Sequence, residues 1–270
     1  LVMKNSKGIL IIGADSEIGS YIFNKYKKIG VQVDGTSRRK TFTENEKIKF
    51  DLLDKNYPFD FDNYDTCLIC AGINKIEYCD NKPVQARNVN VLSIIKLIEQ
   101  CKNNNIYVIF LSSASVFDGT RSFYQVTDKP KPFTKYGKFK FEVEKFILNN
   151  YLEKTSILRL SKVISPNTPI IKKWLNEYAE GKLIYAYRDK FIAPVSLDEV
   201  FLKLNILLSV KKSGIFHLSG KYDISFYDFS KNFFKEERIF DVKIKPIYFY
   251  KDKKDLKGKY SSLFNSVIDI

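Results

Sequence analysis

Short apolar runs alternate with segments of helical spacing in the first part of the chain. A continuous apolar run, Ile9 to Ile12, is followed by a break at Gly13. Apolar residues then recur at Ile18, Ile22, Phe23 and Ile29. A continuous run is typical of a central parallel strand that is buried on both faces, whereas the later spacing is that of an amphipathic helix. The pattern therefore predicts a strand, a tight turn and a helix.

The same alternation continues to residue 150. Four further strands are predicted at VQVDGTSRR (31–39), IKFDLLD (48–54, ending at Asp51-Leu52), YDTCLICAGIN (64–74) and IYVIFLSSASVFDG (106–119). A helix is predicted after Pro83, with its inward face at Val89, Leu92, Ile95 and Leu97 or Ile98. A second helix is predicted from residues 133–135 to about 150, with Phe139, Val143, Phe146 and Ile147 inward. Strands and helices in this order predict an α/β fold, a Rossmann-type doubly wound parallel sheet.

The last third of the chain is less regular. We expect a sixth strand at TSILRLSKVI (155–164), a helix at residues 170–181, and a return to the core through a helix within 191–210. His217, the single histidine, lies in a predicted strand and turn, and we interpret it as structural. We expect residues 7–160 to form the main domain and residues 161–270 to form mostly a small lobe, with some elements returning to the core.

Composition narrows the range of partners. The chain has 270 residues, 44% hydrophobic and 28% charged, and lacks the run of about 18 apolar residues that a membrane span needs. The N-terminus has no secretory pattern, so we expect a cytoplasmic location. The net charge of +14 is carried mainly by lysines spread along the chain. That distribution favours anionic small molecules over nucleic acid.

The four cysteines do not predict a metal site. Cys67 and Cys70 form a C-x-x-C pattern inside a predicted strand. Residues three apart on a strand point to opposite faces, so these two thiols cannot hold one ion. We expect reduced thiols and no metal.

The segment between the first strand and helix has the spacing of a dinucleotide-binding turn. Gly13 permits a tight bend, and Gly19 lets the helix pack closely on the strand, so that free N–H groups at the helix start face a pyrophosphate. Ser16 stands at the middle glycine position, where its hydroxyl could itself bond a phosphate. The residues expected around the pyrophosphate are Gly13, Asp15, Ser16, Glu17, Ile18 and Gly19.

The second strand decides between NADP(H) and NAD(H). An acid at the strand end would accept the ribose 2′-hydroxyl of NAD, whereas arginine near a small hydroxyl residue would hold the 2′-phosphate of NADP. Asp34 has roughly the expected separation from Gly13, but we place it within the strand, before Ser37, Arg38 and Arg39 at the tip. NADP(H) is therefore favoured over NAD(H). Other strand ends supply residues beside the adenine and along the cofactor, namely Asp51, Leu52, Ala71 and Gly72.

A serine, a tyrosine and a lysine are the candidate catalytic residues. Ser113 ends the fifth predicted strand, at the edge of the sheet where ligands bind in open α/β folds. Tyr136 and Lys140 lie one turn apart on the following helix. With 17 tyrosines in the chain, such a pair can arise by chance, but its order after Ser113 and the dinucleotide turn favours catalysis. An ammonium and an oxidised nicotinamide nearby would lower the phenol pKa from about 10 toward working pH.

These motifs resemble those of the extended short-chain dehydrogenases/reductases. The matching features are Gly13-x-x-x-x-x-Gly19, Asp51-Leu52, Cys70-Ala71-Gly72, Asn90, Ser112-Ser113-Ala114 and Tyr136-x-x-x-Lys140. Within that superfamily the chain is similar to dTDP-4-dehydrorhamnose reductase and its relatives. That likeness rests on residues 76–80 before Pro83, Val116-Phe117-Asp118-Gly119, Arg159-Leu160-Ser161 and residues 214–220.

The resemblance implies a bound NADPH and a keto group on a nucleotide-activated sugar, as in precursor synthesis for surface polysaccharide. Tyr136 would protonate the keto oxygen, Lys140 would lower the tyrosine pKa and bond the nicotinamide ribose, and Ser113 would polarise the carbonyl. Cys70 and Asn90 would belong to the cofactor pocket; Asn90 could equally be a buried amide bonded to backbone. Relatives often dimerise through the helices around 84–103 and 134–150, so a homodimer is possible.

The chain also departs from the family pattern. Ser16 replaces the middle glycine, Ala114-Ser115 stands where the reductases usually carry Asp-Tyr, and Lys162 replaces a customary Trp. Ser115, Lys162 and Arg188 are the candidate substrate contacts in the expected substrate lobe and beside the catalytic serine. Two alternatives stay open: a sugar-nucleotide epimerase or dehydratase with tightly bound NAD(P), and a non-catalytic NADP-binding regulator.

Overall fold

A parallel sheet forms the centre of the molecule. The computed structural model describes residues 7–39, 47–250 and 256–268. The sheet has seven strands in the order β11-β6-β5-β4-β1-β2-β3, and every pairing in it is parallel. Its strands are β1 (Gly8–Ile12), β2 (Val33–Ser37), β3 (Lys47–Lys49), β4 (Tyr64–Ile69), β5 (Tyr107–Ser113), β6 (Thr155–Leu160) and β11 (Gly214–Leu218). The predicted doubly wound sheet is confirmed.

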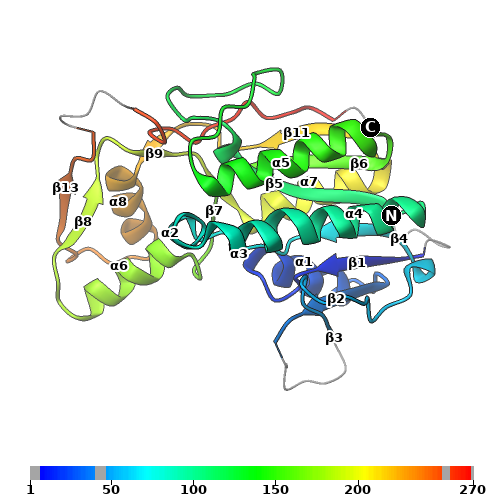
Figure 1. Cartoon of the computed structure of the whole chain (residues 1–270). Helices are drawn as coiled ribbons and strands as arrows, with labels where there is room; N and C mark the ends of the chain where they lie inside the picture. The colour runs from blue at the N-terminus through cyan, green and yellow to red at the C-terminus, as the bar shows by residue number, and fades with distance from the viewer. Residues whose placement is uncertain (1–6, 40–46, 251–255, 269–270) are drawn as a thin grey trace.

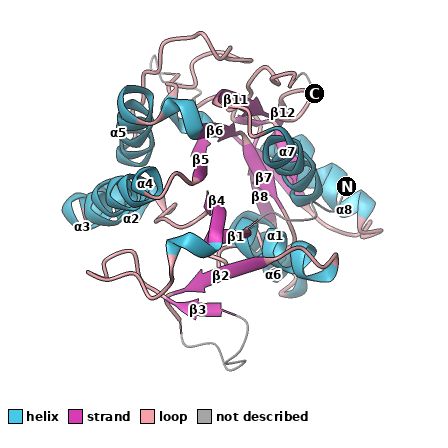
Figure 2. Cartoon of the chain, turned by 90° about the vertical axis from the view of Figure 1, so that its right-hand side faces the viewer, coloured by secondary structure: helices cyan, strands magenta, loops and turns pink. Residues whose placement is uncertain are grey.

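Helices cover both faces of this sheet, as Figure 2 shows along its edge. One face carries α2 (Ile76–Asn81), α3 (Pro83–Arg87), a π-helical turn (Asn88–Leu92), α4 (Ser93–Asn103) and α5 (Lys135–Asn150). The other carries α1 (Glu17–Lys28) and α7 (Leu197–Val210). Alternate side chains of β5 pack into the hydrophobic cores on the two faces of the sheet, because successive strand side chains point to opposite faces. Phe110 packs with α4 and α5, whereas Ile109 and Leu111 pack with α1 and α7.

The remaining elements form a smaller lobe to one side of the sheet (Figure 1). In it α6 (Pro169–Ala179) and α8 (Phe226–Glu236) pack on the parallel pair β8 (Ile184–Tyr187) and β13 (Ile244–Ile247) around a buried Trp174. Two short pairs connect the lobe to the sheet domain, β7 (Lys162–Ile164) with β10 (Pro194–Ser196) and β9 (Phe191–Ile192) with β12 (Ile224–Ser225). Short 3₁₀ turns lie at Phe61–Asn63, Ala114–Val116 and Leu152–Lys154.

Three predictions from the apolar pattern were wrong in detail. Leu92, predicted to face the sheet, is 48% exposed, whereas Val91 is buried. The π-helical turn explains this, because both residues lie in it and its wider turn changes which of its side chains face the sheet. Ile29 lies at the C-cap of α1 and is exposed, and Tyr26 is buried instead. The third strand ends at Lys49, so Asp51 and Leu52 belong to the turn after it.

Other expectations hold. Phe139, Val143 and Ile147 are the buried residues of α5 that were predicted to face the sheet. All four cysteines are free thiols, and Cys67 and Cys70 contact opposite core clusters. Within the part of the chain that the structure describes, no helix has the length and apolar character of a membrane span.

Candidate functional site

The turn between β1 and α1 is held too tightly for a side chain at its first glycine. Gly13 has φ +84°, and a Cβ there would lie 2.8 Å from the Cα of Ala71. The Gly13 N–H donates to Oγ1 of Thr36 at 3.1 Å, and the Ala14 N–H donates to the Thr36 carbonyl at 2.8 Å. The bend therefore sits between the ends of β2 and β4, as the predicted strand–turn–helix requires.

Ser16 has a structural task that its position in the motif did not reveal. It is the N-cap of α1, and its Oγ accepts a hydrogen bond from the Gly19 N–H at 3.1 Å. A Cβ on Gly19 would lie 2.2 Å from the Gly13 carbonyl oxygen, so helix and turn are in direct backbone contact. The remaining N–H groups of the first turn point out of the helix start, where an anion binds favourably.

A cleft of about 470 Å³ lies over the carboxyl ends of β1, β2 and β4. Eleven of the predicted cofactor residues line it: Gly13, Asp15, Ser16, Glu17, Ser37, Arg38, Arg39, Asp51, Leu52, Ala71 and Gly72. Ile18, Gly19, Cys70, Asn90, Tyr136 and Lys140 are not among its lining residues. The lining residues that were not predicted are Ile12, Thr36, Phe50, Leu53, Val89 and the segment Ile73-Asn74-Lys75. Most of these directly follow or precede predicted strand-end residues, which was the available signal.

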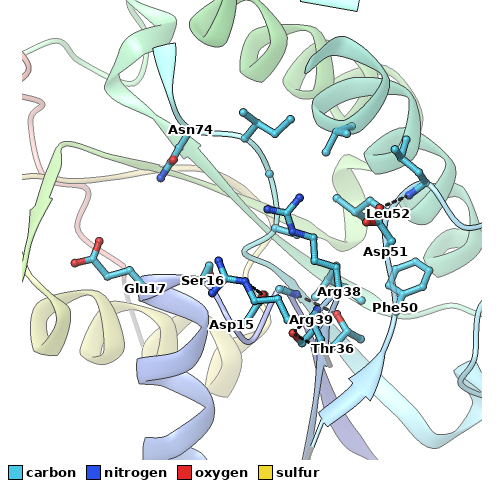
Figure 3. A pocket seen from close by; sticks show the side chains of 18 of the residues that line it. Asp15, Ser16, Glu17, Thr36, Arg38, Arg39, Phe50, Asp51, Leu52 and Asn74 are labelled. Carbon is cyan, nitrogen blue, oxygen red and sulfur yellow. Dashed lines mark hydrogen bonds and ion pairs between the residues drawn. The ribbon is translucent and has the colours of Figure 1, made fainter. Parts of the chain in front are cut away.

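The two arginines after β2 lie differently in the cleft. Arg39 Nε is 3.6 Å from Oδ2 of Asp15, and its backbone N–H donates to Oγ of Ser37 at 3.1 Å. Figure 3 shows Arg38 extending over the middle of the cleft, with Arg39 folded back beside Asp15. Asp34 is within β2, as predicted, and its Oδ2 accepts a hydrogen bond from the Tyr64 hydroxyl at 2.9 Å. Of the two arginines at this strand tip, Arg38 is therefore the one placed to bind a ligand.

Asn90 supports the cleft wall from behind. It is buried on the π-helical turn, and its Oδ1 accepts from the Ile73 N–H at 2.7 Å while its Nδ2 donates to the Ile73 carbonyl at 2.9 Å. A Cβ on Gly72 would lie 3.1 Å from the same Oδ1. The side chain thus fixes the backbone after β4, so of its two predicted roles the structure bears out the buried amide bonded to backbone, here at the wall of the cleft.

The three candidate catalytic side chains converge at the end of β5. Ser113 is its last residue, and its hydroxyl is close enough to the Tyr136 phenol to lower the phenol pKa. Lys140 Nζ donates to the Leu111 carbonyl at 2.8 Å and lies 5.9 Å from the centre of the Tyr136 ring. Thr134 caps the helix by accepting from the Gly137 N–H at 3.0 Å, which begins α5 one residue before the tyrosine.

The protonation states differ from the sequence-based expectation. Burial raises the pKa of Tyr136 to about 12, although the neighbouring Ser113 hydroxyl acts in the other direction. Burial also lowers the pKa of Lys140 to about 8, against the influence of Cys70 and Glu144. The expected lowering of the tyrosine pKa by the ammonium is not found in the chain alone, where burial dominates because the phenolate would lose its hydration. The tyrosine is a protonated acid at neutral pH.

The three candidate substrate residues lie on separate elements. Ser115 is beside the catalytic serine, since its N–H donates to Oγ of Ser113 at 3.1 Å. Lys162 begins β7, and burial lowers the pKa of its ammonium. Arg188 follows β8 in the smaller lobe, with its guanidinium 5.2 Å from the centre of the Tyr227 ring. Their roles in substrate binding stay predictions.

Comparison with known proteins places this chain in a family. The model of the RmlD substrate binding domain matches residues 7–268. The chain belongs to this family. The resemblance to dehydrorhamnose reductases that the motifs predicted is thereby confirmed. A dTDP-4-dehydrorhamnose reductase from Clostridium acetobutylicum aligns with a TM-score of 0.80 at 22% identity, covering 96% of this chain and 90% of that one. One from Bacillus anthracis, solved in complex with NADP, aligns with a TM-score of 0.81 at 18% identity, covering 97% and 92%.

Sequence relatives carry two kinds of name. The probable low-salt glycan biosynthesis reductase Agl14 of Haloferax volcanii is 27% identical over 241 residues, which cover 82% of this chain and 77% of that protein. Methionine adenosyltransferase 2 subunit beta of Bos taurus is 29% identical over 159 residues, which cover 57% of this chain and 46% of that protein. The chain thus matches about half the length of the bovine subunit.

Proposed function

We propose that this protein is an NADP(H)-dependent reductase of the keto group of a nucleotide-activated sugar, serving the synthesis of surface polysaccharide precursors. The observation that carries the proposal is the convergence of Ser113, Tyr136 and Lys140 at the end of β5. The name of the Haloferax relative, a glycan biosynthesis reductase, supports the reaction class. An α/β sheet of this kind binds ligands at the carboxyl ends of its strands, where these three residues lie.

The residues of the cleft fit a dinucleotide. The start of α1 offers N–H groups to a pyrophosphate, and Gly13 and Ala71 line the cleft beside it, packed so closely that a side chain on Gly13 would not fit. Arg38 would hold the 2′-phosphate of NADP(H), because Arg39 is already turned toward Asp15. When bound, the cofactor supplies the hydride for the reduction.

The proposed roles of the three catalytic side chains follow from their protonation. With a pKa of about 12, Tyr136 holds its proton at neutral pH and donates it to the keto oxygen as negative charge develops there. Ser113 places a second hydroxyl beside the same oxygen and orients the phenol. Lys140 is mostly an ammonium at pH 7 and would bond the nicotinamide ribose, while the Leu111 carbonyl fixes its position.

A panel assay tests this function. NADPH is incubated with nucleotide-linked keto sugars, and loss of absorbance at the reduced-nicotinamide band is followed for the wild type, for Tyr136→Phe and for Tyr21→Phe. Tyr21 is a suitable control because its hydroxyl donates to Asp198 between α1 and α7, on the other face of the sheet. Turnover by the wild type and Tyr21→Phe, with loss in Tyr136→Phe, is the expected result.

Two other outcomes point to the alternative functions. Tightly retained oxidised cofactor, with interconversion of sugars and no net NADPH consumption, would identify an epimerase or dehydratase. The bovine relative, named as a subunit of an adenosyltransferase, favours the third candidate, a non-catalytic NADP-binding regulator. That candidate is correct if the protein binds NADP(H) without turnover and Tyr136→Phe keeps full biological activity.

The proposed enzyme forms a homodimer through the helices around 84–103 and 134–150. Val84 and Leu92 on the first of these and Leu148 on the second are exposed apolar side chains. Light scattering after size-exclusion chromatography measures the mass, and Leu92→Glu is expected to shift a dimer to monomer. A monomer at all accessible concentrations would exclude this arrangement.

A further inference from the structure

A fully buried ion pair joins α5 to the central sheet. Glu144 on α5 and Arg159 on β6 have exposed fractions of 0% and 1%. The pair is bidentate, with Nη2 to Oε2 at 2.7 Å and Nε to Oε1 at 3.0 Å. Isolated buried charges are costly, and a buried pair contributes little to stability unless its hydrogen bonds are complete. Stability alone therefore does not account for the Glu144–Arg159 pair in the core.

The hydrogen bonds around this pair lead to three neighbouring strands. Ser112 Oγ on β5 donates to Oε1 of Glu144 at 2.5 Å. Arg159 Nη1 lies 3.3 Å from Nε2 of His217 on β11, and the guanidinium carbon lies 5.1 Å from the centre of the Phe117 ring. We call Ser112, Glu144, Arg159 and His217 the buried polar network. It ties α5 to β5, β6 and β11 at one level of the sheet.

This level is one residue and one helical turn away from the candidate catalytic groups. Ser112 directly precedes Ser113 in β5, and Glu144 follows Lys140 by one turn of α5. The helix is thus fastened to the end of β5 by two side chains, Lys140 on the Leu111 carbonyl and Glu144 on Ser112. These two bonds lie next to the place where Tyr136 on α5 comes near Ser113. The contact is close, because a Cβ on Gly137 would lie 2.0 Å from the Ser115 carbonyl oxygen.

We propose that Glu144 and Arg159 are positioning residues of the proposed reduction. They hold α5 in register with the end of β5, so that the Tyr136 and Ser113 hydroxyls lie beside each other. The inference rests on the proposed function. Directional hydrogen bonds fix a helix along its axis and about it, whereas apolar packing alone tolerates sliding. A shift of α5 by about 1 Å would separate the two hydroxyls, and a misplacement of that size can cost about 100-fold in rate.

Kinetics of matched variants on one helix test the proposal. Glu144→Gln removes the charge and keeps the shape, while Glu142→Gln, also on α5, breaks the exposed pair with Arg87 of α3. For Glu144→Gln we expect kcat to fall at least about 10-fold. The Kd for NADPH is expected to stay within about twofold of the wild type, because the proposed cofactor contacts other than Lys140 lie on other elements. Glu142→Gln is expected to keep both values. Unchanged kcat in a folded Glu144→Gln, or an equal loss in Glu142→Gln, would overturn the proposal.

Ser112→Ala covers the case in which Glu144→Gln does not fold. This variant removes one hydrogen bond from the carboxylate and leaves the ion pair in place. A smaller fall in kcat, about threefold or more, with unchanged NADPH affinity is expected, since one of several hydrogen bonds is lost. A wild-type kcat in the Ser112→Ala enzyme would refute the positioning role.

A readout without turnover separates this proposal from the proposed function. The charged or titratable groups acting on Lys140 are Cys70 after β4 and Glu144 on α5, and its ammonium also faces the Tyr136 ring. In protein with isotope-labelled lysine, NMR titration of the Lys140 amine, identified by its loss in Lys140→Met, is expected to move to lower pH in Glu144→Gln and to stay in place in Glu142→Gln. An inactive wild type would refute the reductase alone, whereas an unmoved Lys140 titration in Glu144→Gln would refute the positioning network.

Discussion

Acid is expected to destabilise the protein through its single histidine. His217 is fully buried in β11, and its Nε2 faces Nη1 of Arg159 at 3.3 Å. Since a guanidinium nitrogen only donates, Nε2 must be the unprotonated acceptor of a neutral imidazole. Burial, and then the Arg159 charge, lower the pKa of His217 from 6.5 to about 4, and the nearby backbone of Tyr124 and Phe264 offsets this only in part.

The size and sign of the effect follow from linkage. The unfolded imidazole takes up a proton near pH 6.5 and the folded one only near pH 4, so the contribution to stability is complete above pH 6.5 and is lost as the pH falls toward 4. One pH unit of pKa difference is worth about 1.4 kcal/mol, so the full effect is about 3 kcal/mol and about 2.5 kcal/mol is lost between pH 7.5 and 4.5.

Urea unfolding of the wild type and His217→Gln at these two pH values measures the effect. The glutamine oxygen can still accept from Arg159 but cannot become a cation. Carboxylates titrate in both proteins, so their contribution cancels in the comparison. We expect the free energy of unfolding of the wild type to fall by about 2.5 kcal/mol more than that of the variant. Equal losses in the two proteins would refute the assignment of a neutral, buried imidazole.

Three further predictions concern the cleft and the site. Arg38→Ala is expected to weaken NADPH binding roughly 10-fold or more in a fluorescence titration, because a charge-assisted hydrogen bond is lost; NADH binding is expected to stay unchanged, and an equal loss for both cofactors would contradict this role. Gly13→Ala is expected to cost about 1–3 kcal/mol of stability and to weaken NADPH binding, because its Cβ would meet Ala71, whereas Gly181→Ala, also at positive φ but with open space around it, is expected to leave binding intact. If Gly13→Ala binds NADPH as tightly as wild type, the cleft does not require the tight bend. The pH profile of kcat for reduction is expected to decline above pH 8, where Lys140 loses its proton; a flat profile to pH 9.5 would contradict a role for its charge.

Local patterns in the sequence determined the order of elements and the identity of several site residues. Gly13 and Gly19 lie between an apolar run and a segment of helical spacing, as in a dinucleotide-binding turn, and Tyr136 and Lys140 share a helix face because they are one turn apart. Such features depend on residues close in sequence, so they can be recognised before the chain is folded.

Tertiary packing decided the rest, because it brings together residues that no short pattern connects. The network of Ser112, Glu144, Arg159 and His217 joins four elements spread over more than 100 residues of chain. The π-helical turn that brings Asn90 to the cleft wall depends on packing against the sheet, and it rotates the inward face away from Leu92. The pKa of Tyr136 could not be predicted from the sequence either. It depends on the loss of hydration, which is set by the chain segments that cover the phenol in the folded protein.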